Sequence, residues 1–249
     1  MIHLFTDFGL EGPYIGQVKA VLARECPRNE IVDLFSDLPP FNAKAAAYLL
    51  AAYGPSSNQG DIVIAVVDPT VGSARDGIVV EINGVWYVGP DNGIFEILLR
   101  HSSCVARCWR IVWRPKVVSP SFHGRDIFAP VASWIAKGSG PETGSDSRFL
   151  PTEANKITQR NWPDDLPEVI YIDHFGNMIT GLRGAMVGPT AIISIKGMQL
   201  QRHTTYSDVC KNVPFCYDNG NGLLEIAVNR GRADQYFKVG VGGAVSCTH

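Results

Sequence analysis

The sequence lacks the features that several functional classes require. Its six cysteines show neither a CxxC pair nor the spacing of a zinc site, so we expect reduced thiols and a cytoplasmic protein. A formal net charge of -2 disfavours nucleic acid or an anionic membrane as the main partner. The longest strongly apolar helical stretch, Ala43 to Tyr53, is too short to span a bilayer. Met1 leads almost directly into a strand expected at Ile2 to Phe5, so we expect no signal peptide.

A dinucleotide-binding fingerprint is also missing. The glycines that follow the first expected strand, at positions 9, 12 and 16, do not form the G-x-G-x-x-G pattern. What remains is a chain of 249 residues, 45% hydrophobic and 18% charged, without a repeat or a low-complexity tract. This composition is typical of a globular protein with one large or two modest domains.

Residues 1–140 predict an α/β domain with a mostly parallel sheet flanked by helices, because short apolar strands alternate with amphipathic helices. Asn83-Gly84 predicts a tight hairpin, and Asn42 is expected to cap a helix. Helices are expected from Tyr14 to just before Pro27, from Asn42 to Tyr53, from Asp91 to Arg100 and from Asp126 to Gly138. Strands are expected at Ile2 to Phe5, Ile31 to Leu34, Ile62 to Val67, Ile78 to Ile82 and Val85 to Val88.

The second half of the chain differs from the first in composition and in hydrophobic pattern. Residues 141–167 are rich in Gly, Ser, Thr, Asp and Pro without an apolar period, which indicates a linker. Residues 168–249 then predict short strands separated by Gly and Asn turns, as in a small C-terminal β-barrel or sandwich. These strands are expected at Val169 to Ile172, Ala191 to Ile195, Met198 to Leu200, Leu223 to Val228 and Tyr236 to Val241.

The most informative segment of the chain runs from Val66 to Arg75. The apolar run Ile62 to Val67 is typical of a strand buried on both faces of a parallel sheet, and Asp68 follows at its carboxyl end. Open α/β sheets bind their ligands at that edge. Arg75 can fold back toward Asp68, although such a pair taken alone is more often a surface ion pair.

Three further segments place polar groups at strand ends. Asp7 follows the first strand, where a carboxylate accepts ribose hydroxyls or caps a helix with about equal frequency. His123 lies in a tight polar loop before a helix, at the expected ligand edge of the sheet. Asp173 and Asn177 follow the first strand of the second half, where turn formation is the favoured interpretation and recognition of a heterocycle edge is the alternative.

Six short motifs occur in a fixed order along the chain. They are Thr6-Asp7-Phe8-Gly9, Asp68-Pro69-x-Val71-Gly72-x-x-Arg75, Gly89-Pro90-Asp91-Asn92-Gly93, Phe122-His123-Gly124-Arg125-Asp126, Asp173-His174-Phe175-Gly176-Asn177 and Gly222-Leu223-Leu224-Glu225-Ile226-Ala227-Val228-Asn229. Together they resemble the S-adenosyl-L-methionine hydroxide adenosyltransferases, relatives of the bacterial fluorinase and chlorinase. The resemblance extends over nearly the whole chain and thins through the linker and residues 182–205.

The resemblance implies a reaction and an assembly. Members join an α/β domain to a C-terminal β-barrel and form homotrimers, with the substrate between the N-domain of one subunit and the C-domain of the next. Water or hydroxide attacks the ribose C5′ carbon of S-adenosyl-methionine, which yields adenosine and methionine. No cofactor or metal is implied.

Site residues carry over from the matching motifs. Asp68, Arg75 and His123 match the family's catalytic Asp, Arg and His, and Asp7 matches the residue that holds the ribose hydroxyls. In the second half, Asn177 with Asp173 would hold the amino-acid end of the substrate. Tyr206 would stack on adenine, and the backbone around Val228 and Arg230 would bind the adenine edge.

These residue types suit the chemistry. Water has a pKa near ~15.7, so an enzyme at neutral pH must create or stabilise a nucleophilic oxygen. Asp68 can orient water and accept its proton, while Arg75 and His123 stabilise charge or relay the proton. Thr70 departs from the family pattern, where glycine is common. Asp68 and the short turn at Asn83-Gly84 both disfavour halide transfer, because the halogenases carry an aromatic residue and a long insertion at these places.

Two other functions are compatible with the same residues. A divalent metal bound near the strand ends would make the chain a phosphoester hydrolase acting on a nucleotide. Alternatively, the chain is a non-catalytic module that binds adenosine. The candidate metal ligands are Asp7, Asp68, Asp91, Asn92 and His123.

Overall fold

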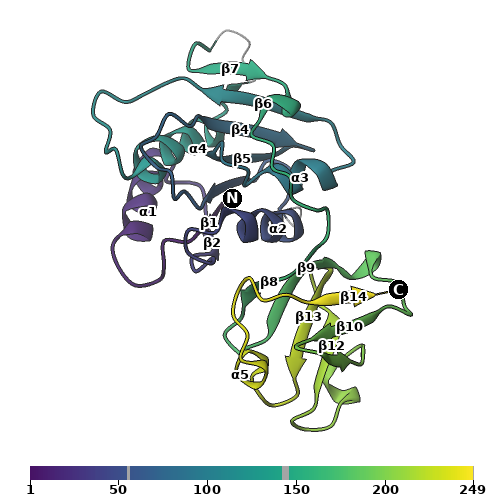
Figure 1. Ribbon diagram of the computed structural model, residues 1–249. Helices are drawn as coiled ribbons and strands as arrows, with labels where there is room; N and C mark the ends of the chain where they lie inside the picture. The colour runs from purple at the N-terminus through teal and green to yellow at the C-terminus, as the bar shows by residue number, and fades with distance from the viewer. Residues whose placement is uncertain (55–56, 142–145, 249) are drawn as a thin grey trace. The chain divides into compact units, whose positions relative to one another are not determined.

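The computed structural model describes residues 1–54, 57–141 and 146–248 (Figure 1). The chain divides into two units, Met1–Asn161 and Trp162–His249. Each unit has its own buried core. Among the residues described, no helix combines the length and the apolarity needed to cross a membrane.

The first unit is built on a seven-stranded sheet with the order β2-β1-β3-β5-β4-β6-β7. Strands β2, β1, β3 and β5 pair in parallel, whereas β4, β6 and β7 are added by antiparallel pairing. The mixed α/β class predicted for this half is therefore confirmed. The strands are β1 (Ile2–Thr6), β2 (Ile31–Phe35), β3 (Ile62–Val66), β4 (Gly77–Ile82), β5 (Val85–Pro90), β6 (Ala106–Ile111) and β7 (Phe149–Thr152).

Helices cover both faces of the parallel part, which is why β3 is buried along its whole length. The chain passes from β1 outward to β2 and then back to β3, so right-handed crossovers place the first two helices on opposite faces. Figure 1 shows α1 grouped with α4 and α2 grouped with α3. The helices are α1 (Tyr14–Glu25), α2 (Ala43–Tyr53), α3 (Glu96–His101) and α4 (Ala129–Ala136).

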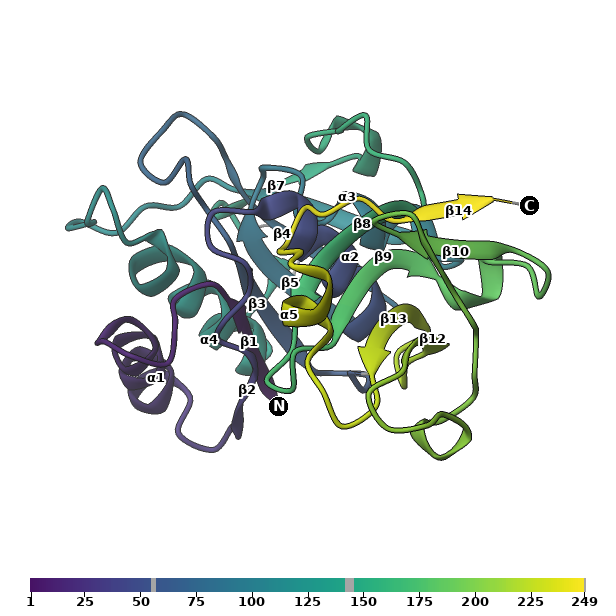
Figure 2. The same cartoon turned by 60° about the horizontal axis from the view of Figure 1, so that its bottom comes forward.

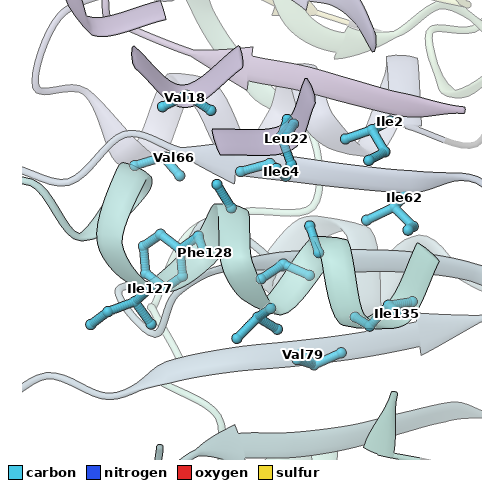
Figure 3. Packing of buried hydrophobic residues seen from close by; sticks show 14 of the residues in the cluster. Ile2, Val18, Leu22, Ile62, Ile64, Val66, Val79, Ile127, Phe128 and Ile135 are labelled. Carbon is cyan, nitrogen blue, oxygen red and sulfur yellow. The ribbon is translucent and has the colours of Figure 1, made fainter. Parts of the chain in front are cut away.

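The core beneath α1 and α4 follows the period of the helices. Val18 and Leu22 of α1 are one turn apart and both buried, and they pack over Ile64 of β3 (Figure 3). Ile135 contributes from α4, and Phe128 contributes from the turn that leads into it. The buried α1 and α4 faces thus fix the loops that leave β1 and β3 at one edge of the sheet.

Two local predictions are confirmed. The Asn42 side chain accepts a hydrogen bond from the Ala45 backbone amide at 2.9 Å, so it caps α2. Asn83 and Gly84 have φ values of 52° and 78°, the positive pair that a type I′ hairpin between β4 and β5 requires.

Two predicted helices begin elsewhere. The helix expected from Asp91 starts only at Glu96, because Gly93 has φ 100° and interrupts any helix through it. The helix expected from Asp126 begins two residues earlier, at Gly124, with the wide helical turn Gly124–Phe128 that leads into α4. Asp126 accepts a hydrogen bond from the Ser119 amide at 2.7 Å, so its carboxylate holds the preceding loop instead of starting the helix.

Part of the stretch expected to be a linker forms structure in the first unit. Strand β7 pairs antiparallel with β6, from Ile111 opposite Phe149 to Cys108 opposite Thr152. Its Pro151 is tolerated because β7 is an edge strand. A four-residue edge strand is held mainly by backbone hydrogen bonds to its neighbour. Its sequence therefore need not alternate apolar and polar residues, and the strand is hard to predict from sequence.

The second unit consists of two antiparallel sheets with the orders β12-β13-β9-β8 and β11-β10-β14. The strands described between residues 162 and 248 form two antiparallel sheets around a shared core, and closure into the predicted β-barrel is not confirmed. Figure 2 shows β8, β9 and β13 running side by side. The strands are β8 (Leu166–Ile172), β9 (Met178–Arg183), β10 (Ile192–Ile195), β11 (Met198–Leu200), β12 (Pro214–Asp218), β13 (Leu223–Val228) and β14 (Ser246–Thr248).

One predicted strand is a helix. Tyr236 lies in α5 (Ala233–Phe237), and Lys238 ends that helix with φ 52°. Asp234 in the first turn accepts from the Gln235 amide at 2.8 Å, a local bond that favours a helix start over an extended chain. The strand expected at Tyr236 to Val241 is therefore wrong.

Candidate functional site

The loops after β1 and β3 bring Asp7 and Asp68 to one edge of the sheet. β1 lies between β2 and β3, so the next strands are added on opposite sides of β1, and the space between β1 and β3 is the topological switch point. Open α/β sheets bind ligands outside the carboxyl ends of their strands at this point. The placement of these two carboxylates follows from strand order as well as from sequence.

Asp68 and Arg75 form a buried, two-pronged ion pair. Arg75 Nε donates to Asp68 Oδ1 at 3.1 Å and Arg75 Nη2 donates to Oδ2. The side chains of Arg75 and Asp68 are only 9% and 5% exposed, respectively, so this is not a surface ion pair. Thr70 adds a hydrogen bond from its hydroxyl to Oδ1 at 3.2 Å.

His123 is joined to the same guanidinium. Arg75 Nη2 lies 3.0 Å from His123 Nδ1. A guanidinium only donates hydrogen bonds, so Nδ1 must accept and the ring proton must sit on Nε2. Burial, followed by the charge of Arg75, lowers the pKa of His123 below its ordinary value and favours the neutral ring.

Gly72 allows the two loops to meet. Its φ is +84°, and a Cβ added there would lie 2.5 Å from the backbone oxygen of Pro120. Any side chain at this position would therefore push the Asp68 loop away from the loop that carries His123.

The carboxylate of Asp7 is the third charged group at this edge. Its Oδ2 accepts a hydrogen bond from the backbone amide of Phe41 at 2.9 Å. Burial raises the pKa of Asp7, and the nearby charge of Asp68 adds to that effect. Phe41 itself has φ 61°, an uncommon conformation for a bulky residue and one that concentrates at functional sites.

A cavity of about 340 Å³ joins these groups. Asp7, Asp68 and His123 line it, while Arg75 bridges Asp68 and His123 from behind. The aromatic walls of the cavity were not predicted from sequence, although an aromatic residue directly after Pro39-Pro40 was a usable signal. The aromatic lining residues are Phe8, Tyr14, Phe41 and Phe122.

Asp91 and Asn92 have structural roles. The Asn92 amide donates to the Val67 carbonyl at 2.8 Å, and Asp91 Oδ1 accepts from the Thr158 amide at 2.8 Å. Within residues 1–54, 57–141 and 146–248, no group of three or more His, Cys, Asp or Glu side chains is arranged to hold a metal ion. These hydrogen bonds occupy two of the ligands that the metal hypothesis invoked.

The second unit brings together the other candidate residues. Asp173 and Asn177 bound the turn between β8 and β9. Oδ1 of Asp173 accepts from the Asn177 backbone amide at 2.8 Å, and Oδ2 accepts from its side-chain amide at 2.9 Å. Both hydrogen bonds close the turn between the two strands, so turn formation is the role of this pair that the contacts show.

Tyr206 lies at the side of a wide, open depression. Arg230 shares this depression, is exposed and has φ 57°. Val228 is buried at the end of β13, and its carbonyl accepts from the Gly231 amide at 3.0 Å. Asn229 ties Tyr206 to this turn by donating to the Tyr206 carbonyl at 3.2 Å.

The fold and the first cavity define an α/β ligand-binding protein with acid–base groups at its switch point. The chain belongs to the SAM hydroxide adenosyltransferase family. Residues 2–144 match the N-terminal domain of that family and residues 167–246 match its C-terminal domain.

Similar proteins cover almost all of the chain. A protein of Thermus thermophilus named (R)-S-adenosyl-L-methionine hydrolase is 39% identical over 243 residues, 93% of each chain. A protein of Methanocaldococcus jannaschii with the same name is 31% identical, over 91% of this chain and 88% of its own. An uncharacterized conserved protein from Thermotoga maritima has a crystal structure that superposes with a TM-score of 0.87 at 28% identity and covers 100% of both chains.

Proposed function

We propose that this chain hydrolyses S-adenosyl-L-methionine to adenosine and L-methionine. The observation that carries the proposal is the buried Asp68–Arg75 ion pair, joined to His123 and lying beside Asp7 at one cavity. Membership of the hydroxide adenosyltransferase family and the names of the similar proteins support the same reaction.

The reaction is a displacement at the ribose C5′ carbon. The oxygen of water or hydroxide forms the new C–O bond, the C–S bond breaks, and the sulfonium sulfur takes the electron pair to become the neutral thioether of methionine. The remaining proton of an attacking water leaves to a base. Because an anionic oxygen meets a cationic sulfonium, charge is cancelled in the transition state, which a water-poor site favours.

Each group of the cavity has a role in this scheme. Asp68 orients the attacking water and accepts its proton, and the Nε2–H of neutral His123 donates to the nucleophilic oxygen. Arg75 holds the Asp68 carboxylate in place and holds His123 in the tautomer that donates. Asp7 accepts the two ribose hydroxyls, which fixes C5′ in line with the nucleophile.

The test is direct. Purified protein treated with a chelator should convert S-adenosyl-methionine to adenosine and methionine without added metal. Activity that disappears with chelator and returns with manganese or magnesium would instead support the metal-dependent phosphoesterase. Binding of adenosine without any turnover would support the non-catalytic module.

We further propose that the active form is a homotrimer in which sites are completed between chains. The support is the division of candidate groups: Asp7, Asp68 and His123 belong to one unit, and Asn177 and Tyr206 to the other. We also propose a cytoplasmic location, which is supported by the six free cysteines.

Complementation tests the shared site. Asp68→Ala and Asn177→Ala chains should each be inactive, and an equal mixture, reassembled together, should recover roughly a quarter of wild-type activity because each site takes one unit from each of two chains. No recovery from reassembled mixtures, or a fully active monomer in sedimentation, would refute this arrangement.

A further inference from the structure

A chain of polar side chains lies behind Tyr206 and has no part in the scheme above. Glu225 of β13 is 5% exposed and accepts a hydrogen bond from the Tyr217 hydroxyl. Its other oxygen accepts from the Asn219 side-chain amide at 3.1 Å. The Tyr217 hydroxyl lies 3.3 Å from the hydroxyl of Tyr206.

A buried carboxylate at position 225 lowers the stability of the fold, which a purely structural residue would not do. Tyr217 and Asn219, which donate to it, are both neutral, and the charge of Asp173 acts on it unfavourably. Burial raises the pKa of Glu225 accordingly. Buried carboxylates without a cationic partner are expensive, so an apolar residue at this strand position would favour stability. This mismatch is typical of a residue retained for function.

Strand alternation places Glu225 on the functional face. Ile226 and Val228 point into the main core of the unit, whereas Ala227 packs in a separate cluster with Phe215 and the two tyrosines. Glu225 and Ala227 are two residues apart and so share that second face. The carboxylate therefore acts on Tyr206 through side chains on one surface of the sheet.

The carboxylate also sets the direction of the hydrogen bonds. Tyr217 gives its only hydroxyl proton to Glu225, so its oxygen must accept from Tyr206. The Tyr206 hydroxyl proton is thereby committed to Tyr217, so toward a ligand the Tyr206 oxygen can only accept a hydrogen bond.

We propose that Glu225 and Tyr217 are positioning residues that orient Tyr206 for the substrate. This rests on the proposed function, with Tyr206 in the adenine-stacking position that the family resemblance implies. The Tyr206 ring is held from two sides, by an edge contact with Phe215 at 5.1 Å between ring centroids and by the hydroxyl bond to Tyr217. Removal of the hydroxyl bond leaves the ring held from one side only.

The experiment compares Tyr217→Phe, Tyr206→Phe and the double variant with wild type. Each single variant should raise the KM for S-adenosyl-methionine and the Kd for adenosine about three- to tenfold, the equivalent of one neutral hydrogen bond. Most of the fall in kcat/KM should come from KM, because the reacting atoms meet the first unit. The double variant should bind no worse than the poorer single one, since both remove the same bond.

Two further variants complete the design. Tyr236→Phe, which changes a half-exposed tyrosine of α5, is the matched control and should bind as wild type. Glu225→Gln keeps the size and an acceptor oxygen but removes the charge, so it should raise KM in the same direction even if Tyr217→Phe proves too unstable to purify.

The outcomes separate the two proposals. A wild-type protein that neither binds nor cleaves S-adenosyl-methionine would overturn the proposed function. An active wild type with unchanged KM in Tyr217→Phe and Glu225→Gln, or with effects that add in the double variant, would overturn the positioning role while leaving the reaction intact.

Discussion

The replacement of Arg75 by lysine tests whether geometry or charge alone matters at the site. The guanidinium donates in several directions: Nε to Asp68 Oδ1 at 3.1 Å, Nη2 to Oδ2, Nη2 to His123 Nδ1 at 3.0 Å and Nη1 to the Asp76 carbonyl at 3.0 Å. A lysine keeps the charge but offers its hydrogens from one nitrogen, so it cannot span both Asp68 oxygens and His123.

The magnitude follows from the hydrogen bonds that a lysine cannot make. At least two hydrogen bonds to charged groups disappear, each worth about 1.5–3 kcal/mol, which sums to about 3–6 kcal/mol shared between folding and the transition state. If about half of this, roughly 1.5–3 kcal/mol, acts on the transition state, turnover falls about 10- to 10²-fold, since about 1.4 kcal/mol changes a rate tenfold. Substrate affinity should change less, because Arg75 lies behind the cavity lining.

Single-turnover release of adenosine measures the chemical step, and calorimetry with S-adenosyl-methionine measures affinity. Arg183→Lys is the matched control. Arg183, the last residue of β9, donates two hydrogen bonds to the carboxylate of Asp165 in the same two-pronged geometry. The control should lose some stability and no turnover. A folded Arg75→Lys protein with turnover within tenfold of wild type would refute the geometric argument.

Three other predictions concern single residues. Because His123 acts as a neutral ring and its pKa is lowered, kcat/KM should fall only when the pH drops below the usual histidine range. Since the charge of Arg75 contributes to that lowering, NMR titration of Arg75→Met should show a higher pKa for His123. Asp7→Ala should raise the Kd for adenosine at least a hundredfold in calorimetry, since it removes two charge-assisted hydrogen bonds to ribose, each about 1.5–3 kcal/mol; a change below tenfold would contradict the ribose role. Asn42→Ala should lower the free energy of unfolding by about 0.5–2 kcal/mol in urea, with activity retained, because only the α2 cap is removed.

The features that depend on short-range physics could be predicted from the sequence alone. The run Ile62 to Val67 is apolar throughout, so it forms a buried central strand wherever its neighbours lie. Asn83-Gly84 adopts two positive φ values that few other pairs tolerate, and Asn42 bonds to an amide three residues away. Asp7 and Asp68 follow strand ends, so their shared edge was predictable as soon as parallel pairing was assumed.

Other features required contacts that no local pattern encodes. Strand β7 is defined by its partner β6, and α5 replaces an expected strand because Asp234 bonds locally. Asn92 resembled a metal ligand in sequence, yet its amide satisfies the Val67 carbonyl. Closure of the second unit into a barrel is likewise beyond any local pattern, because it depends on which edge strands meet.

The site shows the same division. Residue types and spacing indicated Asp68, Arg75 and His123, but folding was needed to bring one guanidinium nitrogen to both Asp68 and His123. That shared contact assigns the tautomer of His123. Likewise, Glu225 was part of a recognised motif, and only the packing of β12 against β13 placed Tyr217 between it and Tyr206. The reason is physical: propensity and turn chemistry act over a few residues, whereas a proton's position depends on every donor and acceptor that folding brings within about 3 Å.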